Sequence, residues 1–239
     1  MTFPGGSKTV VIVGRNDKTK RSGTILQIAE NLRSRGYTLH EFESDRSRIS
    51  RMITERMARK WPRFAGDPKQ LRAHWRLLYL AVKSFLVLKS RRRWDFVQAA
   101  LRSTPVEAAR ELNHFLNQLP AGCACLITHS AGGIAATKAA VMASPASSRI
   151  ARIVCFGYPF KHPDHGPETY RTRHLPSVPC PLLIVQGTDD PYGSDPARFG
   201  AYLPADARIA MFDCGHDYNG LPPAEFDRAW ATVAEFLSA

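Results

Sequence analysis

The chain has 239 residues, of which 44% are apolar, and a net charge of +12. This length fits one α/β domain, and this apolar content supports a sizeable core, which excludes an intrinsically disordered chain. Five cysteines without a CxxC pair argue against a disulfide framework and favour a reducing, cytoplasmic location. The N-terminus lacks the pattern of a signal peptide, and the longest apolar stretch, 77–88, is too short to span a bilayer.

The excess positive charge lies in one segment. Residues 45–102 hold sixteen Lys and Arg but only four Asp and Glu, so this segment alone carries a net charge of +12 and the remainder is balanced. We therefore expect residues 1–239 to form a single domain that carries a basic helical insertion at 45–102.

Short apolar runs alternate with amphipathic helical patterns along the chain. We expect strands at 9–14, 38–42, 123–127, 152–156, 181–187 and 207–212. We expect helices at 23–35, 46–60, 69–89, 105–119, 134–143 and 222–237, and a loop at 158–179. Continuously apolar strands that alternate with helices are typical of a parallel sheet covered on both faces. The sequence therefore predicts an α/β fold with a mostly parallel sheet, in which Cys123, Cys125 and Cys155 are buried free thiols.

Ser130 lies between an expected strand and a helix rich in small residues, in the run Thr128-His129-Ser130-Ala131-Gly132-Gly133. A serine on such a sharp turn needs small neighbours, because a larger side chain would clash with the backbone of the turn. This arrangement is typical of a nucleophile elbow.

Two further polar positions follow later strands. Asp190 lies in Gly187-Thr188-Asp189-Asp190-Pro191, and His216 lies in Cys214-Gly215-His216-Asp217. A histidine can take the proton of the serine, and a carboxylate can orient the histidine and stabilise its charged form. The sequence predicts Ser130, His216 and Asp190 as a catalytic triad, with Asp189 as the competing carboxylate.

With these three residues, the chain resembles the α/β-hydrolase superfamily, and within it the dienelactone-hydrolase-like branch with the testis-expressed and KAT8-complex-related serine hydrolases. Nucleophile, acid and histidine occur in the chain order of this superfamily. Beside the elbow, the stretches that carry the likeness are Gly157-Tyr158-Pro159-Phe160, Arg171-Thr172-Arg173-His174-Leu175, Gln186-Gly187-Thr188-Asp189-Asp190-Pro191-Tyr192-Gly193 and Gly215-His216. The resemblance covers residues 8–44 and 105–239, and it implies a serine hydrolase without naming a substrate.

The sequence departs from the family pattern at two places. Thr128 stands where the elbow usually has glycine, so Gly132 would have to supply the close contact of the turn. The loop after the first strand reads Gly14-Arg15-Asn16-Asp17-Lys18 instead of a glycine-rich oxyanion loop. We expect the Ala131 amide to be one oxyanion donor and the backbone of Arg15 or Asn16 to be the other. Loss of one donor costs about 2.7–4 kcal/mol of transition-state stabilisation, which leaves weak activity as an alternative.

The basic insertion admits several interpretations. Its stretch 69–89 carries a broad apolar surface edged by Arg72, Arg76, Lys83 and Lys89, and Arg91-Arg92-Arg93-Trp94 follows directly. It fits a lid over the site, a recognition surface for an anionic ligand, a membrane-surface contact, or a helical hairpin with a solvated basic face. The chain lacks a recognisable nucleic-acid motif, which argues against a nucleic-acid partner.

The resulting functional prediction is a cytoplasmic hydrolase of small-molecule esters or thioesters that needs no cofactor. The alternative is a catalytically weak or inactive binding module that docks an anionic partner through its insertion. His162 and His165 are spaced as metal ligands, but no Cys, Asp or Glu completes a ligand set, so we expect no metal. We expect His174 to be a structural hydrogen-bonding residue near the site.

Overall fold

The computed structural model describes residues 8–14, 22–64, 73–89, 94, 97, 104–120 and 122–239. Its strands are β1 (Thr9–Val13), β2 (Thr38–Phe42), β3 (Ala124–His129), β4 (Ile150–Phe156), β5 (Lys161–His162), β6 (Gly166–Pro167), β7 (Leu182–Gly187) and β8 (Arg208–Phe212). Its α-helices are α1 (Gly23–Ser34), α2 (Asp45–Lys60), α3 (Ala73–Lys89), α5 (Thr104–Gln118), α6 (Ala131–Val141), α7 (Thr169–Thr172), α8 (Pro196–Gly200) and α9 (Pro223–Ser238).

The described strands build one six-stranded sheet and a small hairpin. The order of the large sheet is β2-β1-β3-β4-β7-β8, and each neighbouring pair is parallel. β3 and β7, in the middle of the sheet, are buried at every position, as expected for strands covered on both faces. The predicted α/β fold with a mostly parallel sheet is confirmed.

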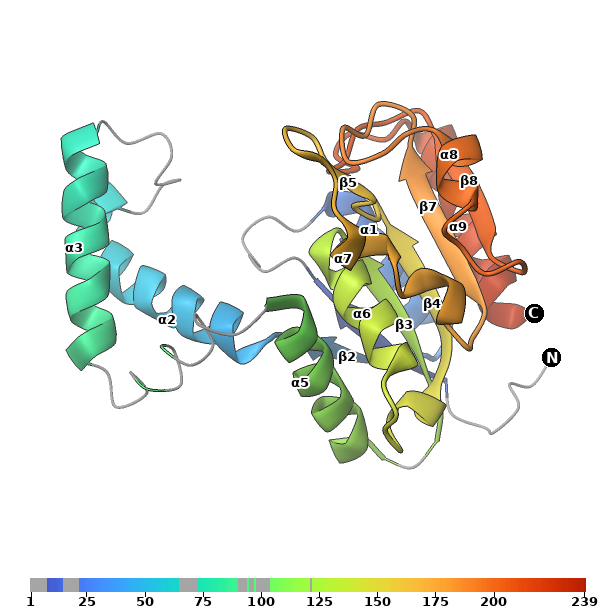
Figure 1. Cartoon of the computed structure of the whole chain (residues 1–239), viewed down its shortest axis with the longest axis horizontal. Helices are drawn as coiled ribbons and strands as arrows, with labels where there is room; N and C mark the ends of the chain where they lie inside the picture. Colours follow the sequence, from blue (N-terminus) through green and yellow to red (C-terminus); the bar gives the residue numbers. More distant parts are fainter. Residues whose placement is uncertain are drawn as a thin grey trace.

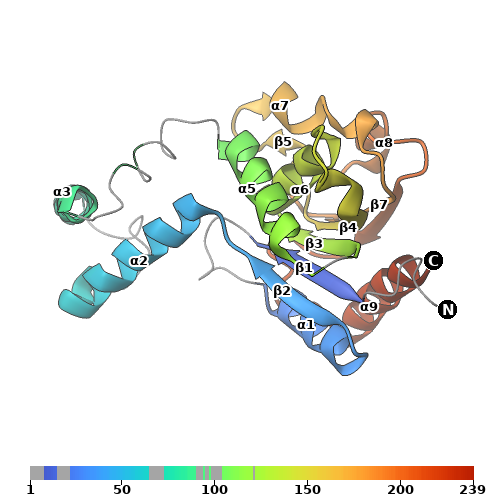
Figure 2. The same cartoon turned by 90° about the horizontal axis from the view of Figure 1, so that it is seen from below.

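Helices cover both faces of the sheet (Figures 1 and 2). Alternate residues of a strand point to opposite faces, so Val11, Leu126 and Ile153 share one core with residues of α5 and α6. Their neighbours in the same strands, such as Val10 and Ile127, share the other core with residues of α1 and α9. Two separate hydrophobic cores therefore hold the carboxyl ends of the strands in place.

The neighbouring strands β1 and β3 are followed by helices on opposite faces. α1 follows β1 and packs in the core shared with α9, whereas α6 follows β3 and packs in the core shared with α5. The chain therefore diverges where these two strands end, which is where open α/β sheets place their ligand sites.

Helices α2 and α3 project from the α/β body (Figures 1 and 2). We call residues 45–64 and 73–89 together the α2–α3 arm. The arm has a small core of its own, composed of Ile49, Ile53, Met57, Phe64, Tyr79 and Val87. Its base is tied to the body by an ion pair between Arg51 and Glu43 at 2.9 Å and by the backbone N–H of Asp45, which donates to Glu111 at 2.7 Å.

Within the described residues, no helix is long and apolar enough to cross a membrane.

Several elements differ from the sequence prediction. α6 begins at Ala131 instead of residue 134, and the expected loop 158–179 contains β5, β6 and α7. α8, with five residues, is too short for its periodicity to be recognised. For the expected helix 69–89, residues 69–72 lie outside the described part of the chain.

The cysteines of the chain are free thiols. Cys125 and Cys155 are buried as predicted, and burial raises the pKa of each thiol to about 12. Cys123 is only half-buried, because it precedes β3 instead of forming part of it. Cys180, for which no burial was predicted, is buried beside the start of β7.

Candidate active site

Ser130 forms a one-residue turn between β3 and α6. Its backbone has φ 54° and ψ −125°, a conformation that side-chain-bearing residues rarely adopt. The turn is fixed by two backbone bonds, because the Ser130 N–H donates to the Phe156 carbonyl at 2.9 Å and the Ser130 carbonyl accepts from Gly133 N–H at 2.8 Å. The strained backbone conformation therefore belongs to Ser130 itself, whose side chain lies at the end of β3.

Gly132 lets the first turn of α6 approach the end of β1. A Cβ atom on Gly132 would lie 2.3 Å from the Val13 carbonyl oxygen and 2.9 Å from that of Gly14. Thr128 stands in β3 and pairs with Val13 across the sheet, so its β-branched side chain lies on regular strand backbone. Gly132 therefore makes the close contact, and Thr128 is compatible with the sharp turn.

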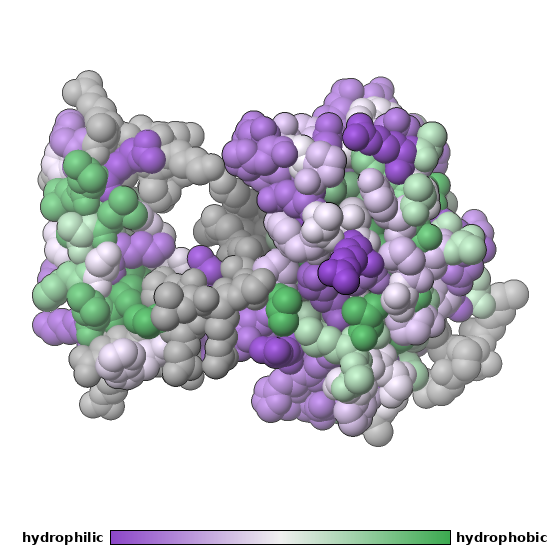
Figure 3. All heavy atoms as spheres, viewed as in Figure 1, coloured by the Kyte–Doolittle hydropathy of each residue, from purple (hydrophilic) through white to green (hydrophobic). Residues whose placement is uncertain are grey.

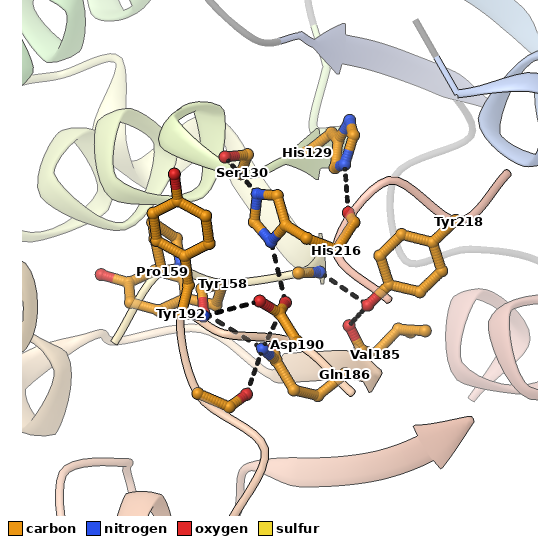
Figure 4. Close-up of polar contacts among 12 residues, drawn as sticks. His129, Ser130, Tyr158, Pro159, Val185, Gln186, Asp190, Tyr192, His216 and Tyr218 are labelled. Carbon is orange, nitrogen blue, oxygen red and sulfur yellow. Dashed lines mark hydrogen bonds and ion pairs between the residues drawn. The ribbon is translucent and has the colours of Figure 1, made fainter. Parts of the chain in front are cut away.

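The side chains of Ser130, His216 and Asp190 lie in one line of hydrogen bonds (Figure 4). Oγ of Ser130 lies 2.8 Å from Nε2 of His216, and Nδ1 of His216 lies 2.8 Å from Oδ2 of Asp190. With the proton assigned to Nδ1, the imidazole donates to the carboxylate and can accept from the serine hydroxyl. Both His216 and Asp190 are buried, whereas Ser130 is partly accessible.

Asp190, and not Asp189, makes the contact with His216. Asp189 is exposed, whereas two further donors hold the carboxylate of Asp190. The Gln186 side-chain amide donates to Oδ2 at 2.8 Å, and the backbone N–H of Tyr192 donates to Oδ1 at 2.8 Å. Gln186 also donates to the Gly193 carbonyl at 2.6 Å, so it joins the end of β7 to the turn that follows Asp190.

The ring of His216 is confined by backbone and by a second ring. Gly157, at the end of β4, has φ 57°, and a Cβ atom there would lie 3.1 Å from Nδ1 of His216. The ring of Tyr192 lies against the imidazole, with centroids 4.4 Å apart. His129, the residue before Ser130, lies 3.0 Å through Nε2 from the backbone carbonyl of His216. These contacts leave the imidazole little freedom to rotate.

Tyr218 anchors the segment that carries His216. It has φ 52° and is almost fully buried. Its hydroxyl donates to the Val185 carbonyl at 2.6 Å and accepts from the Gly157 N–H at 2.9 Å, so it bridges the ends of β7 and β4. Its own carbonyl accepts from the Thr24 hydroxyl at 2.6 Å, at the start of α1. Burial raises the pKa of Tyr218 well above its usual value, so the phenol stays protonated as this bonding requires.

Of the three predicted oxyanion residues, the described part of the chain contains only Ala131. Ala131 is the first residue of α6, and the first amides of a helix have no intrahelical acceptor and favour negative charge. Arg15 and Asn16 lie outside the described residues, directly after Gly14 in the sequence. Gly14 itself lies beside the first turn of α6 through the close contact with Gly132.

Three histidines of the predicted loop lie apart from this line of contacts. Nε2 of His174 lies 2.8 Å from the Thr137 hydroxyl of α6, and burial, followed by the charge of Lys138, lowers the pKa of His174 to about 4. The rings of His162 and His165 stack with centroids 4.4 Å apart at the β5–β6 hairpin. Among the described residues, no group of three or more His, Cys, Asp or Glu side chains is placed to hold a metal ion.

The site also contains residues to which the sequence analysis gave no role. Gln186 and Gly157 lie in stretches that carried the family resemblance, but the resemblance did not show that Gln186 holds Asp190 from the end of β7 or that Gly157 leaves room for His216 at the end of β4. The only feature of the sequence that pointed to Tyr218 as a residue of the site is its position two residues after His216.

A protein-family model described as an alpha/beta hydrolase domain matches residues 94–234, which is more than half of the chain. No curated protein matches the chain.

Solved structures share the fold at low sequence identity. Dienelactone hydrolase from Anabaena variabilis is 16% identical, with 99% of this chain and 88% of that chain covered and a TM-score of 0.54. Alpha/beta hydrolase domain-containing protein 10 from mouse is 10% identical, with 99% and 92% covered and a TM-score of 0.55. The esterase domain of a Rhodothermus marinus protein is 14% identical, with 95% and 85% covered and a TM-score of 0.53. At these identities the likeness concerns the fold, and the narrower resemblance to the testis-expressed and KAT8-complex-related branch stays a prediction.

Proposed function

Because the chain belongs to the alpha/beta hydrolase domain family, we propose that it is a serine hydrolase that cleaves a carboxylic ester or thioester through an acyl-enzyme. The observation that carries the proposal is the pair of 2.8 Å contacts that link Ser130 to His216 and His216 to Asp190. The esterase and dienelactone hydrolase folds support the same class of substrate by analogy.

In the first half-reaction, Oγ of Ser130 attacks the carbonyl carbon while its proton passes to Nε2 of His216. The Asp190 carboxylate stabilises the imidazolium through Nδ1, and its bonds to Gln186 and Tyr192 keep it aligned. The C–O or C–S bond then breaks, and His216 returns the proton to the leaving alcohol or thiol. The acyl group remains on Ser130.

In the second half-reaction, His216 takes a proton from a water molecule whose oxygen attacks the acyl carbon. The bond between the acyl carbon and Oγ of Ser130 then breaks, His216 returns the proton to Oγ, and the carboxylic acid leaves. The oxyanion of each tetrahedral intermediate is held by the Ala131 amide at the N-terminus of α6. The proposed second donor is the backbone of Arg15 or Asn16. The position of Gly14 beside α6 supports this assignment, because the chain leaves the end of β1 at the elbow.

A fluorophosphonate probe tests the nucleophile directly. We expect the wild-type protein to be labelled at Ser130 and the Ser130→Ala variant to stay unlabelled, whereas Ser148→Ala, an exposed serine, should be labelled like the wild type. A folded wild-type protein that stays unlabelled would contradict the proposal and favour the non-catalytic binding module.

Hydrolysis of p-nitrophenyl esters and of acyl thioesters tests the acid and the substrate class. Asp190→Asn should lower kcat by up to about 10⁴-fold, because the wrong imidazole tautomer would face the serine. Asp189→Asn is the matched control, since Asp189 is adjacent and exposed, and its activity should stay at the wild-type level. Equal losses in the two variants would overturn the role of Asp190.

A further inference from the structure

Helix α3 has two apolar faces, of which only one is packed. On the inner face, Tyr79 and Val87 are buried against Ile49, Ile53 and Met57 of α2. The outer face carries five large apolar side chains that are between 45% and 70% exposed: Leu77, Leu78, Leu80, Phe85 and Leu88. Figure 3 shows hydrophobic side chains gathered over α3, away from the α/β body. A large exposed apolar patch of this kind marks an interaction surface.

The outer face is continuous and is bordered by cations. With about 100° of rotation per residue, its five apolar side chains fall within a sector of roughly 160°. Ser84 and His74 are the exposed polar side chains inside this sector. Arg76 and Lys83 follow one edge of the sector and Lys89 follows the other, and the sequence continues into Arg91-Arg92-Arg93. The helix therefore combines an apolar face with cationic margins.

The positive charge of the segment 45–102, which contains the arm, decides which occupant fits this face. A second copy of the chain would bring two segments of net charge +12 together, and like charges of this size repel. An anionic lipid surface offers an apolar phase for the leucines and phenylalanine and negative headgroups for the flanking cations. The outer surface of a helix is convex, so a protein partner would need a matching groove, whereas fluid lipid adapts to the helix.

We propose that the α2–α3 arm docks the protein onto an anionic lipid surface. The outer face of α3 enters the interface, and the exposed Arg76 and Lys89 contact the headgroups, whereas Lys83 donates to the Ser50 hydroxyl of α2 at 3.1 Å. This docking is independent of the proposed hydrolase chemistry, because it uses none of Ser130, His216 and Asp190.

Vesicle flotation of the full-length protein tests the proposal. We expect binding to mixed phosphatidylcholine–phosphatidylglycerol vesicles at low salt, weaker binding at high salt, and little binding to phosphatidylcholine alone. The double variant Leu77→Gln/Phe85→Gln should weaken binding on the order of tenfold or more, because both side chains lose their contact with the acyl phase. Its control is Leu26→Gln at a large apolar side chain of α1 that is 47% exposed, and this variant should bind like the wild type.

A second pair of variants tests the cations. Arg76→Gln/Lys89→Gln should lose about fivefold in affinity for each charge removed. Arg173→Gln/Arg198→Gln removes the same charge from exposed positions of the α/β body and should have no effect. Ser130→Ala should bind vesicles normally, which separates a failure of docking from a failure of the proposed hydrolase activity.

Two results with vesicles would overturn the proposal: no binding to the mixed vesicles, or equal binding to vesicles of phosphatidylcholine alone. Equal losses of binding in the variants and in their controls would also overturn it. So would tighter binding to duplex DNA than to the mixed vesicles at the same salt concentration. Light scattering provides a fifth test. If the wild-type protein is a dimer and Leu77→Gln/Phe85→Gln is a monomer, the outer face of α3 binds a second copy of the chain instead of lipid. Retention of each variant's thermal midpoint shows that lost binding does not come from unfolding.

Discussion

Gly157 lies against His216 and leaves room for the imidazole because it has no side chain. A Cβ atom on Gly157 would lie 3.1 Å from Nδ1 of His216 and 3.3 Å from Oδ2 of Asp190. Gly157 also has φ 57°, which costs a residue with a side chain about 1–2 kcal/mol. The end of β4 thus leaves the space in which the imidazole and the carboxylate meet.

Gly157→Ala should therefore lose both stability and activity. The new methyl group would push the imidazole away from the carboxylate, so we expect kcat/KM to fall about tenfold or more, together with a loss of about 1–2 kcal/mol in the free energy of unfolding. Gly36→Ala is the matched control, because Gly36 also has positive φ but has nothing within 4 Å of its added Cβ. Ester hydrolysis and urea unfolding check the pair, and wild-type kcat/KM in Gly157→Ala would contradict the prediction.

Gly132→Ala should destabilise the fold although alanine favours helices. Helix propensity would contribute up to about 1 kcal/mol, but the Cβ would lie 2.3 Å from the backbone oxygen of Val13. Relief of this clash requires the backbone of β1 or α6 to shift, so we expect the free energy of unfolding in urea to fall by about 1–3 kcal/mol, or the variant to fail to fold. Gly200→Ala, in α8 with nothing near its Cβ, should be neutral. Equal unfolding midpoints for the two variants would show that α6 and β1 can separate.

Gln186→Leu should impair activity because it removes a donor from Asp190. The buried carboxylate and the Gly193 carbonyl would each lose a hydrogen bond, at a cost of about 1–3 kcal/mol for an unsatisfied buried group. We expect a lower kcat with a nearly unchanged KM, since Gln186 acts through Asp190. Gln27→Leu, on the exposed side of α1, is the control for added apolar surface. A raised KM with an unchanged kcat would argue that Gln186 serves substrate binding instead.

His174 should make stability depend on pH in the mildly acidic range. Its pKa is lowered from 6.5 to about 4, chiefly by burial, so the unfolded chain binds a proton that the folded chain excludes. The free energy of unfolding is therefore unaffected above pH 6.5 and falls as the pH drops from about 6.5 to about 4, by up to about 1.4 kcal/mol per pH unit. His174→Gln should flatten this dependence, whereas His165→Gln, at an exposed position, should not. Urea unfolding across this range checks the slope, and parallel slopes for both variants would exclude His174 as the cause.

The sequence predicted well what depends on local pattern. Strand and helix periodicity placed Ser130 and the later Asp190 and His216 after separate strands, and the parallel sheet brings the carboxyl ends of strands to one edge. The early start of α6 was missed because it depends on the positive φ of Ser130, which no periodicity reveals. The sequence favoured Asp190 and kept Asp189 as the competitor, because adjacent residues in a turn point in different directions and the pattern does not show which carboxylate faces the histidine.

Individual side-chain contacts could not be predicted from the sequence, whether the partners are close together in the chain or far apart. Gln186 looked like one residue of a buried strand, and its partner Asp190 became evident only when the turn folded back on β7. Tyr218 gave no sign that its hydroxyl would join β4 and β7. Five residues of α8 contain too little periodicity for any pattern to register.

The bonds of Tyr218 have a consequence for the order in which the protein is made. The elbow at Ser130 is complete once β4 has formed, but His216 lies near the C-terminus, and its segment is held by Thr24 near the N-terminus. A growing chain on the ribosome therefore possesses the serine long before it possesses the proposed base. We expect the proposed nucleophile to become reactive only when the segment that carries His216 has folded back onto α1.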